Sequence, residues 1–487
     1  RMSGRTSSPY RQLDGLLNAA DRQASMNRFS NHWPCILVGL VLWFVSASRT
    51  VAQNASETTV SYDTDTAVLS EADVLRIALS ENATVKVADM DVRKQEYARR
   101  AARADLFPKV DLNGVYSHTL KKQVLYIDMP GFSSSEGIEM GRTHNTQGGV
   151  NVSMPLVSAQ LWKSIAMTGE QLDLALEKAR SSRIDLVAEV KKAYLSVLLA
   201  EDSYSVFKRS YDNALANYKN ISDKFDRGLV AEYDKIRANV QVRNIEPNLL
   251  QAQNSVALAL WQLKVLMSME VETPIRLSGS LSDYKEQVYT GYFAADTLIS
   301  NNSSLRQLDI QRRLAVSADK LNKYSFLPTL NLGGQYTYSL NSNDFKFWGE
   351  GQRWTPFSTI SLSLYIPIFN GGKRLYNVKQ SALSIRQIDL QRRHIEQSIR
   401  MGIKNQNDRL RTCMQRFVAS EEAVRSAEKG YQIAEKRYQT GESTLVELND
   451  ANVALLQARL NYNQAIFDFM TAKTELDKMN GMGIPEQ

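Results

Sequence analysis

The stretch LPTLNLGGQY, residues 327–336, alternates apolar and small polar side chains and has a counterpart upstream. FPKVDLNGVY, residues 107–116, keeps the proline, the second glycine and the tyrosine in register at an offset of 220. A second pair of segments, VNVSMP at 150–155 and LSLYIP at 362–367, is offset by 212. This self-similarity predicts an internal duplication in which each half runs helix, two strands, very long helix, break and second helix.

The alternation predicts four strands of about ten residues, each with one apolar face and one face of hydroxyl and amide groups. The polar faces are almost free of charge, whereas the outer faces of soluble strands usually carry Lys and Glu. We therefore favour a membrane β-barrel, with lipid outside and water inside, over a soluble sandwich. Aromatic residues near the strand ends fit an interfacial girdle: Tyr126, Phe345, Phe347, Trp348, Trp354 and Phe357.

Four strands cannot close a barrel, and open sheet edges are not tolerated in lipid. Copies of the chain must then share one barrel. Two copies would give eight strands with an interior filled by side chains, and three would give twelve, which is enough for a passage. This argument predicts a trimer.

Two segments without proline, 160–225 and 374–438, predict helices roughly 100 Å long at 1.5 Å per residue. Their partner helices carry apolar residues at coiled-coil spacing, and Pro247 interrupts one of these seams. The better seam consists of Leu448, Ala451, Leu455, Ala458, Tyr462, Ala465 and Phe469. The seams alone also fit a periplasmic four-helix bundle, against which the strands argue.

The first 52 residues predict a leader and an export signal. ILVGLVLWFV, residues 36–45, has the length of a signal-peptide core and is too short to span a membrane as an anchor. Without residues 1–52 the balance is 53 Lys and Arg against 50 Asp and Glu, so no nucleic-acid partner is indicated. We divide the chain into leader and signal peptide (1–52), first repeat (53–295) and second repeat (296–487).

No catalytic constellation is found, and neither enzyme activity nor a cofactor is expected. Cys413 would be the single cysteine of the exported chain, which excludes an internal disulfide and a cysteine-based zinc site. The four histidines, at positions 32, 118, 144 and 394, do not stand at metal-ligand spacing. His118 is assigned to the lipid-side or interface belt rather than to a ligand set.

The duplicated strand entries, IPIFNGGKR at 366–374 and RYQTGESTLVELNDA at 437–451 together resemble the TolC-type outer-membrane efflux factors. The resemblance covers roughly residues 70–480. It implies an α+β membrane protein in which three chains form a twelve-stranded transmembrane β-barrel continued by a twelve-helix periplasmic α-barrel. It also implies an outer-membrane exit duct for efflux or type I secretion. The implied partners are a homotrimer, a periplasmic membrane-fusion adaptor, an inner-membrane pump of the RND or ABC type, and outer-membrane lipid.

The resemblance assigns roles to the two helix breaks. The adaptor-docking tips would be Gly228, Leu229, Val230 and Ala231, and Thr440, Gly441, Glu442 and Ser443. The periplasmic gate would comprise Glu447 and Asp450 as acidic rings, Asp234 and Tyr438 as latch residues, and Ser443 where relatives carry an Arg.

Glu447 has a second interpretation, because Thr444 to Glu447 also fits a capping box and acids are favoured in a first helical turn. Asp450 lies too far along the helix to cap. The alternative function is a periplasmic coiled-coil scaffold or adaptor without a pore. The cargo and the pump class do not follow from the sequence.

Overall fold

The computed structural model describes residues 67–126, 128–129, 132–133, 137–291, 299–349 and 351–482. They belong to the second of two units of the chain, residues 66–487. The predicted leader and signal peptide, residues 1–52, lie outside the described residues.

Four antiparallel strands form one sheet in the order β10-β9-β7-β2. Their bounds are Lys109–His118 for β2, His144–Val157 for β7, Thr329–Ser342 for β9 and Thr355–Tyr365 for β10. These are the four strands that the alternation predicts. The register keeps apolar neighbours together across strands, as where Leu112 pairs with Val150 and Leu332 pairs with Leu362.

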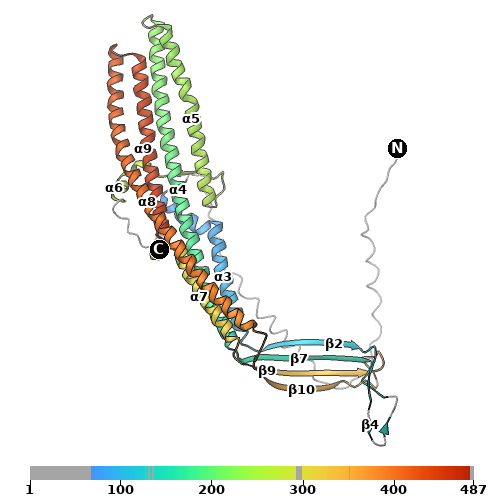
Figure 1. Cartoon of the computed structure of the whole chain (residues 1–487). Helices are drawn as coiled ribbons and strands as arrows, with labels where there is room; N and C mark the ends of the chain where they lie inside the picture. The colour runs from blue at the N-terminus through green and yellow to red at the C-terminus, as the bar shows by residue number, and fades with distance from the viewer. Residues whose placement is uncertain are drawn as a thin grey trace, which may run out of the picture. The chain divides into compact units, whose positions relative to one another are not determined.

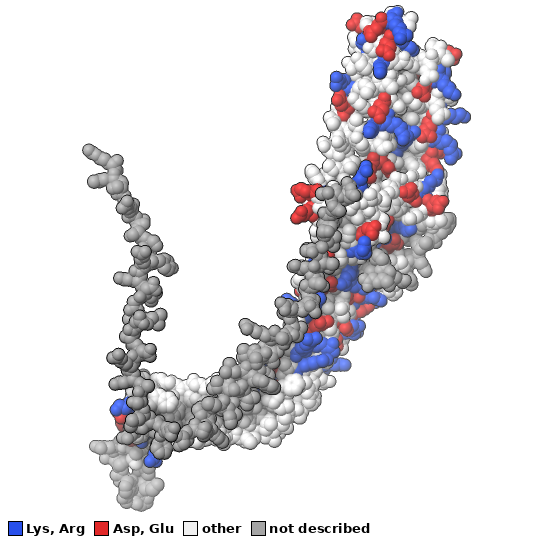
Figure 2. All heavy atoms as spheres, turned by 180° about the vertical axis from the view of Figure 1, so that it is seen from behind, with Lys and Arg blue, Asp and Glu red and all other residues white. Residues whose placement is uncertain are grey.

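The edge strands β2 and β10 are open on both faces within the described chain, whereas the central strand β9 includes the buried residues Thr337 and Leu340. No described helix lies over either face (Figure 1). Every residue of β2 and β10 is exposed, including Leu112 at 83% and Ile360 at 88% of their possible surface. Figure 2 shows charged side chains gathered on the helices, while the visible part of the sheet is nearly free of them. An exposed apolar surface of this kind marks a contact with lipid or with another chain.

Shorter strands were not predicted, because two or three residues are too few to show alternation. Between β2 and β7, β3 (Gln123–Leu125) pairs with β6 (Ile138–Met140), and β4 (Asp128–Met129) pairs with β5 (Phe132–Ser133). A separate two-stranded sheet consists of β1 (Ala67–Leu69) and β8 (Ile275–Leu277), which run parallel to each other.

The helices come in pairs of equal length. The segments α4 (Ala159–Asp226) and α8 (Lys373–Thr440) have 68 residues each, and α5 (Glu232–Leu266) and α9 (Leu445–Met479) have 35 each. The two helices that precede the strand pairs, α3 (Ala83–Ala104) and α7 (Ser303–Tyr324), have 22 each. The described residues also form the helices α2 (Glu71–Glu81) and α6 (Lys285–Gly291) and the 3-10 turns η1 (Leu281–Tyr284) and η3 (Ile299–Asn301).

The long helices agree with the sequence prediction to within two residues at each end. They pack as α4 against α5 and α8 against α9, and α4 also contacts α3, α7 and α9. The helix α5 includes Pro247, the residue that interrupts the apolar seam in the sequence. The predicted α9 seam is confirmed, since Leu448, Leu455 and Phe469 are buried.

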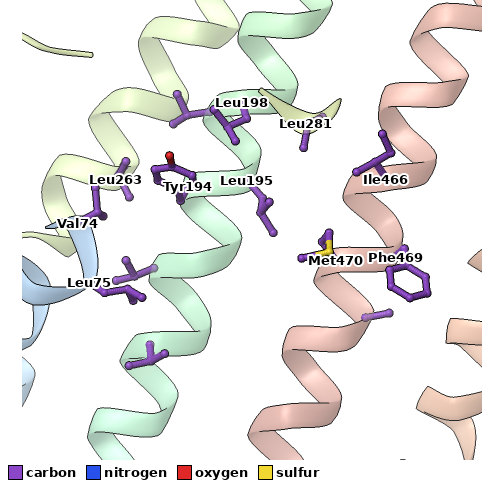
Figure 3. Close-up of a cluster of buried hydrophobic side chains, with 14 of the residues drawn as sticks. Val74, Leu75, Tyr194, Leu195, Leu198, Leu263, Leu281, Ile466, Phe469 and Met470 are labelled. Atoms are coloured by element: carbon purple, nitrogen blue, oxygen red, sulfur yellow. The ribbon is translucent and has the colours of Figure 1, made fainter. Parts of the chain in front are cut away.

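The largest apolar core lies where α2, α4, α5 and α9 meet around the 3-10 turn η1 (Figure 3). Val74, Leu198, Leu263, Ile466 and Phe469 are each at most 1% exposed there. Each such side chain stabilises the fold by about 1.5–3 kcal/mol relative to its exposed state. This core lies at the middle of α4 and α8 and toward the C-terminal ends of α5 and α9, so that the opposite ends of α5 and α9 extend beyond it.

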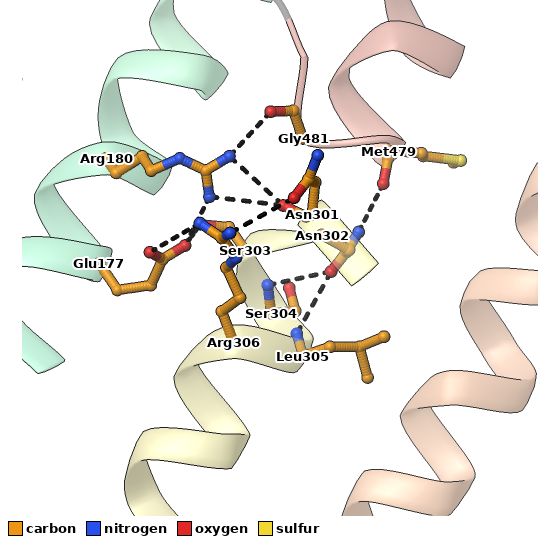
Figure 4. A network of polar contacts seen from close by, with 10 residues as sticks. All are labelled: Glu177, Arg180, Asn301, Asn302, Ser303, Ser304, Leu305, Arg306, Met479 and Gly481. Carbon is orange, nitrogen blue, oxygen red and sulfur yellow. Dashed lines mark hydrogen bonds and ion pairs between the residues drawn. The ribbon is translucent and has the colours of Figure 1, made fainter. Parts of the chain in front are cut away.

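One asparagine joins two helix ends in the second half of the chain. Asn302 Oδ1 accepts hydrogen bonds from the backbone N–H of Ser304 (3.0 Å) and Leu305 (3.3 Å), which caps α7. Its Nδ2 donates to the carbonyl of Met479 at the end of α9, at 2.7 Å (Figure 4). Beside it, Arg180 of α4 donates to the carbonyl of Gly481 at 2.9 Å.

The first half of the chain uses the same arrangement. Asn82 Oδ1 accepts from the N–H of Thr84 at the start of α3 (2.8 Å), and Nδ2 donates to the carbonyl of Leu266 at the end of α5 (2.8 Å). Both asparagines are buried. The C-terminal end of α5 is therefore anchored to α3, and the C-terminal end of α9 is anchored to α7. The helices α3 and α7 are those that precede the two strand pairs.

Candidate functional site at the helix tips

The two predicted breaks are tight turns of one geometry. Gly228 and Gly441 adopt φ values of 71° and 83°, in the left-handed region that favours glycine. After α4, Gly228 N–H donates to the Phe225 carbonyl (2.7 Å) and Leu229 N–H to the Lys224 carbonyl (2.9 Å). This pair of bonds defines a Schellman motif, which satisfies carbonyls left free at a helix end.

The turn after α8 repeats that motif. Gly441 N–H donates to the Tyr438 carbonyl (3.2 Å), and Glu442 N–H donates to the Arg437 carbonyl (2.8 Å). The Arg437 side chain adds a bond from Nη2 to the Glu442 carbonyl at 3.1 Å. The guanidinium thus holds the backbone of the turn from outside.

The two helices that follow the breaks, α5 and α9, start differently. Thr444 caps α9, since its side-chain oxygen accepts from Glu447 N–H at 3.3 Å. Ala231 precedes α5 and has no side chain that could do the same. The Glu447 carboxylate accepts a short hydrogen bond from Ser443 Oγ, at 2.5 Å. Of the expected capping box, only the hydrogen bond to the Thr444 side chain is therefore formed. The Glu447 carboxylate bonds to the Ser443 hydroxyl instead of to the Thr444 backbone N–H.

All four long helices meet just inside the tips. Ile221 of α4, Ala238 of α5 and Leu445 of α9 form a buried cluster, against which Val230 and Tyr438 pack. The cluster joins the two breaks, which are more than 200 residues apart in sequence, into one end of the helical bundle (Figure 1).

The predicted latch residues lie near one another but are not joined by a hydrogen bond among the described residues. Burial raises the pKa of the Tyr438 hydroxyl, and the negative charge of Asp234 raises it further. Lys224 Nζ lies 5.7 Å from the centre of the Tyr438 ring, within the range of a cation–π contact. Sequence reasoning missed Lys224, which has no motif of its own.

The two predicted ring residues lie on the outer side of α9. Glu447 and Asp450 are exposed, while Leu445 and Leu448 are buried against the bundle. Residues three apart in a helix are surface neighbours, so both carboxylates belong to one patch. Within one chain this patch faces away from the buried cluster of Ile221, Ala238 and Leu445. In the described part of the chain, no group of three or more His, Cys, Asp or Glu side chains could hold a metal ion.

A further finding concerns the described helices: none combines the length and the apolar character needed to cross a membrane.

The sequence pattern of the outer membrane efflux protein family matches residues 74–268 and 294–482. The match covers most of the chain, and the protein belongs to this family. Membership confirms the resemblance and places the chain among bacterial outer-membrane proteins.

Its relatives include outer membrane protein TolC of Vibrio cholerae, 23% identical over 68% of this chain and 76% of that protein. TolC of Escherichia coli is 21% identical over 79% of this chain and 78% of that protein. Among solved structures, the CmeC outer membrane channel of Campylobacter jejuni superposes with a TM-score of 0.65 at 17% identity, covering 90% of this chain and 94% of that one. The fold is thus that of TolC-like channels, and these family members are channels rather than enzymes.

Proposed function

We propose that the chain is one third of a trimeric outer-membrane exit duct, which conducts cargo passively from a pump–adaptor complex and catalyses no reaction. Three chains would close a twelve-stranded barrel and continue it as a twelve-helix α-barrel in the periplasm. The same proposal includes removal of residues 1–52 as leader and signal peptide.

The observation that carries this proposal is the open sheet. Within the described residues, the edge strands β2 and β10 each pair with one neighbour only, and both faces of these two strands are exposed. Unpaired strand edges and exposed apolar faces are costly in water, and closure into a barrel removes the edges. Pairing β10 of one chain with β2 of the next would satisfy both edges at once.

The helices support association of the same kind. A groove of about 530 Å³ between α4 and α5 is lined by Leu199, Phe207 and Leu258 among others. Leu258 and the nearby Val265 are 53% and 62% exposed. A helix of a neighbouring chain would cover these apolar side chains.

The internal duplication, with repeats at residues 53–295 and 296–487, is also part of the proposal. It is supported by the equal lengths of the three helix pairs and by the identical use of Asn82 and Asn302. The matching turns at Gly228 and Gly441 add a third correspondence.

The tips would serve as the gate and as the adaptor-docking surface. Three copies of Glu447 and Asp450 would place about six carboxylates around one axis, which favours cations over anions. Asp234 and Tyr438 would act as latch residues between tips, and Ser443 is the position where this latch departs from relatives that carry an Arg. Residues 228–231 and 440–443 would meet the adaptor, which in turn contacts an inner-membrane pump of the RND or ABC type.

The gate is tested with Asp450→Asn combined with Glu447→Gln in planar lipid bilayers. We expect a lower preference for cations and weaker block by multivalent cations, because the fixed negative charge is removed. Glu442→Gln is the matched control, since it removes a charge at the same turn but outside the α9 patch. Unchanged selectivity in the double variant would refute the gate assignment.

The alternative, a periplasmic scaffold without a pore, predicts a protein that stays monomeric in water without detergent. Detergent-dependent, heat-modifiable trimers in the outer-membrane fraction would exclude it.

A further inference from the structure

Two histidines that are 26 positions apart in the sequence face each other at one end of the sheet. His118 is the last residue of β2 and His144 the first of β7, and the two are direct partners in the strand register. The opposite ends of these strands connect to α3 and α4. The pair, which we call the outer histidine pair, therefore lies at the strand end away from the helices.

The two imidazole rings are spaced for a shared ligand. His118 Nδ1 and His144 Nδ1 are 3.4 Å apart, and the ring centres are 4.8 Å apart. Two nitrogen ligands that each lie 2.0–2.1 Å from a tetrahedral metal ion are separated by about 3.3 Å. One ion placed between the rings could bind both nitrogens without a change in strand register.

A third polar atom lies within reach. The Tyr116 hydroxyl is 2.8 Å from His144 Nδ1. The phenol oxygen is thus placed to approach the same ion or to hold a water molecule bound to it.

Aromatic side chains fix the orientation of these groups. Tyr116 stacks on His144 with a ring separation of 6.0 Å and an interplanar angle of 16°. Phe345 contacts His144 edge-on at 5.4 Å, and Phe347 contacts Tyr116 at 5.8 Å. Packing that holds ligand rings in place favours binding, because less freedom is lost when the ion arrives.

We propose that the outer histidine pair is a binding site for a divalent transition-metal ion such as Cu²⁺, Zn²⁺ or Ni²⁺, which imidazole nitrogen binds well. The chain supplies two histidine ligands, and water with the Tyr116 hydroxyl completes the coordination. Hard cations such as Mg²⁺ and Ca²⁺ prefer oxygen ligands and do not compete. The site does not depend on the proposed duct or gate.

The test uses the full exported chain, purified in detergent without added histidines, and CuCl₂ or ZnCl₂ as the probe. Residues 53–487 contain only three histidines, at positions 118, 144 and 394. We expect one metal ion per chain by calorimetry and a Cu²⁺ electron paramagnetic resonance spectrum with coupling to two imidazole nitrogens. His118→Gln and His144→Gln should each weaken binding by at least about tenfold, and Tyr116→Phe by less.

His394→Gln is the matched control, because His394 lies on α8, away from the strand ends that carry His118 and His144. It should leave both the affinity and the spectrum unchanged. Heat dissociation of each variant checks that the assembly is intact. Wild-type affinity in the His118→Gln/His144→Gln double variant, or a spectrum without nitrogen coupling, would overturn the proposal.

Discussion

Gly228 and Gly441 each reverse the chain with a backbone conformation that other residues adopt at a cost. A Cβ at either position would meet no other atom within 4 Å, so any penalty for a substitution comes from the backbone alone. The sequence was sufficient to identify both turns, because a glycine followed by a new apolar seam is a strong helix-stop signal.

We predict that Gly441→Ala destabilises the α8–α9 turn by about 1 kcal/mol, since a Cβ is disfavoured at a φ of 83°. Gly430→Ala is the matched control. Gly430 lies inside α8, where an added Cβ would meet no atom within 4 Å, so alanine should stabilise the helix there by up to about 1 kcal/mol. Hydrogen exchange of residues 437–448 measures both. Equal exchange rates in the two variants would contradict the backbone explanation.

Other features of single residues could not be found from sequence. The Ser443–Glu447 hydrogen bond competes with the capping box that the residue types suggest, and only side-chain geometry decides between them. The outer histidine pair depends on the register of β2 against β7, which a spacing of 26 residues does not reveal.

At the scale of the element, Asn302 ties the start of α7 to the end of α9. We predict that Asn302→Ala destabilises the protein by about 2 kcal/mol, because it removes a helix cap and the hydrogen bond that the side chain donates to the Met479 carbonyl. Asn302→Asp separates the two roles, since a carboxylate caps but cannot donate. The thermal midpoint of Asn302→Asp should therefore lie between the midpoints of wild type and Asn302→Ala. A neutral Asn302→Ala would show that water replaces the asparagine.

The α9 helix also contains a carboxyl group whose environment opposes its charge. Burial raises the pKa of Asp477, against the smaller effect of Lys473 and Lys191. The folded state thus binds a proton more tightly than the unfolded state. This contribution to stability is present below the unfolded pKa of about 3.9 and is lost as pH rises through the folded pKa.

We therefore predict that Asp477→Asn raises the thermal unfolding midpoint at pH 7 and flattens the decline of this midpoint as pH rises above about 3.9. Asp173→Asn serves as a control for charge, because Asp173 is exposed and pairs with Arg313 on the surface. A midpoint for Asp477→Asn that is lower than wild type at pH 7 would show that the ionised carboxylate stabilises α9.

At the scale of the whole molecule, the sequence predicted the elements better than their connections. Alternation in the strands and the absence of proline in α4 and α8 are local signals, and both agree with the structure. The joint packing of four helix ends around Ile221 and Leu445 is long-range, and single-chain periodicity contains no information on it. The small strands β1 and β8 were missed because three residues are too few to show alternation, and the contact between the 3-10 turn η1 and α9 is another long-range feature.

The central claim is that several copies of the chain complete one another's open sheet into a conducting barrel. The most direct test begins with the protein purified in detergent. The mass of the assembly is determined, and the ionic current through the same fraction is then recorded in planar bilayers at high dilution. The account predicts three chains per particle and discrete conductance steps that vanish when heating separates the chains. A particle of one chain, or a trimer that gives no conductance steps, would contradict it.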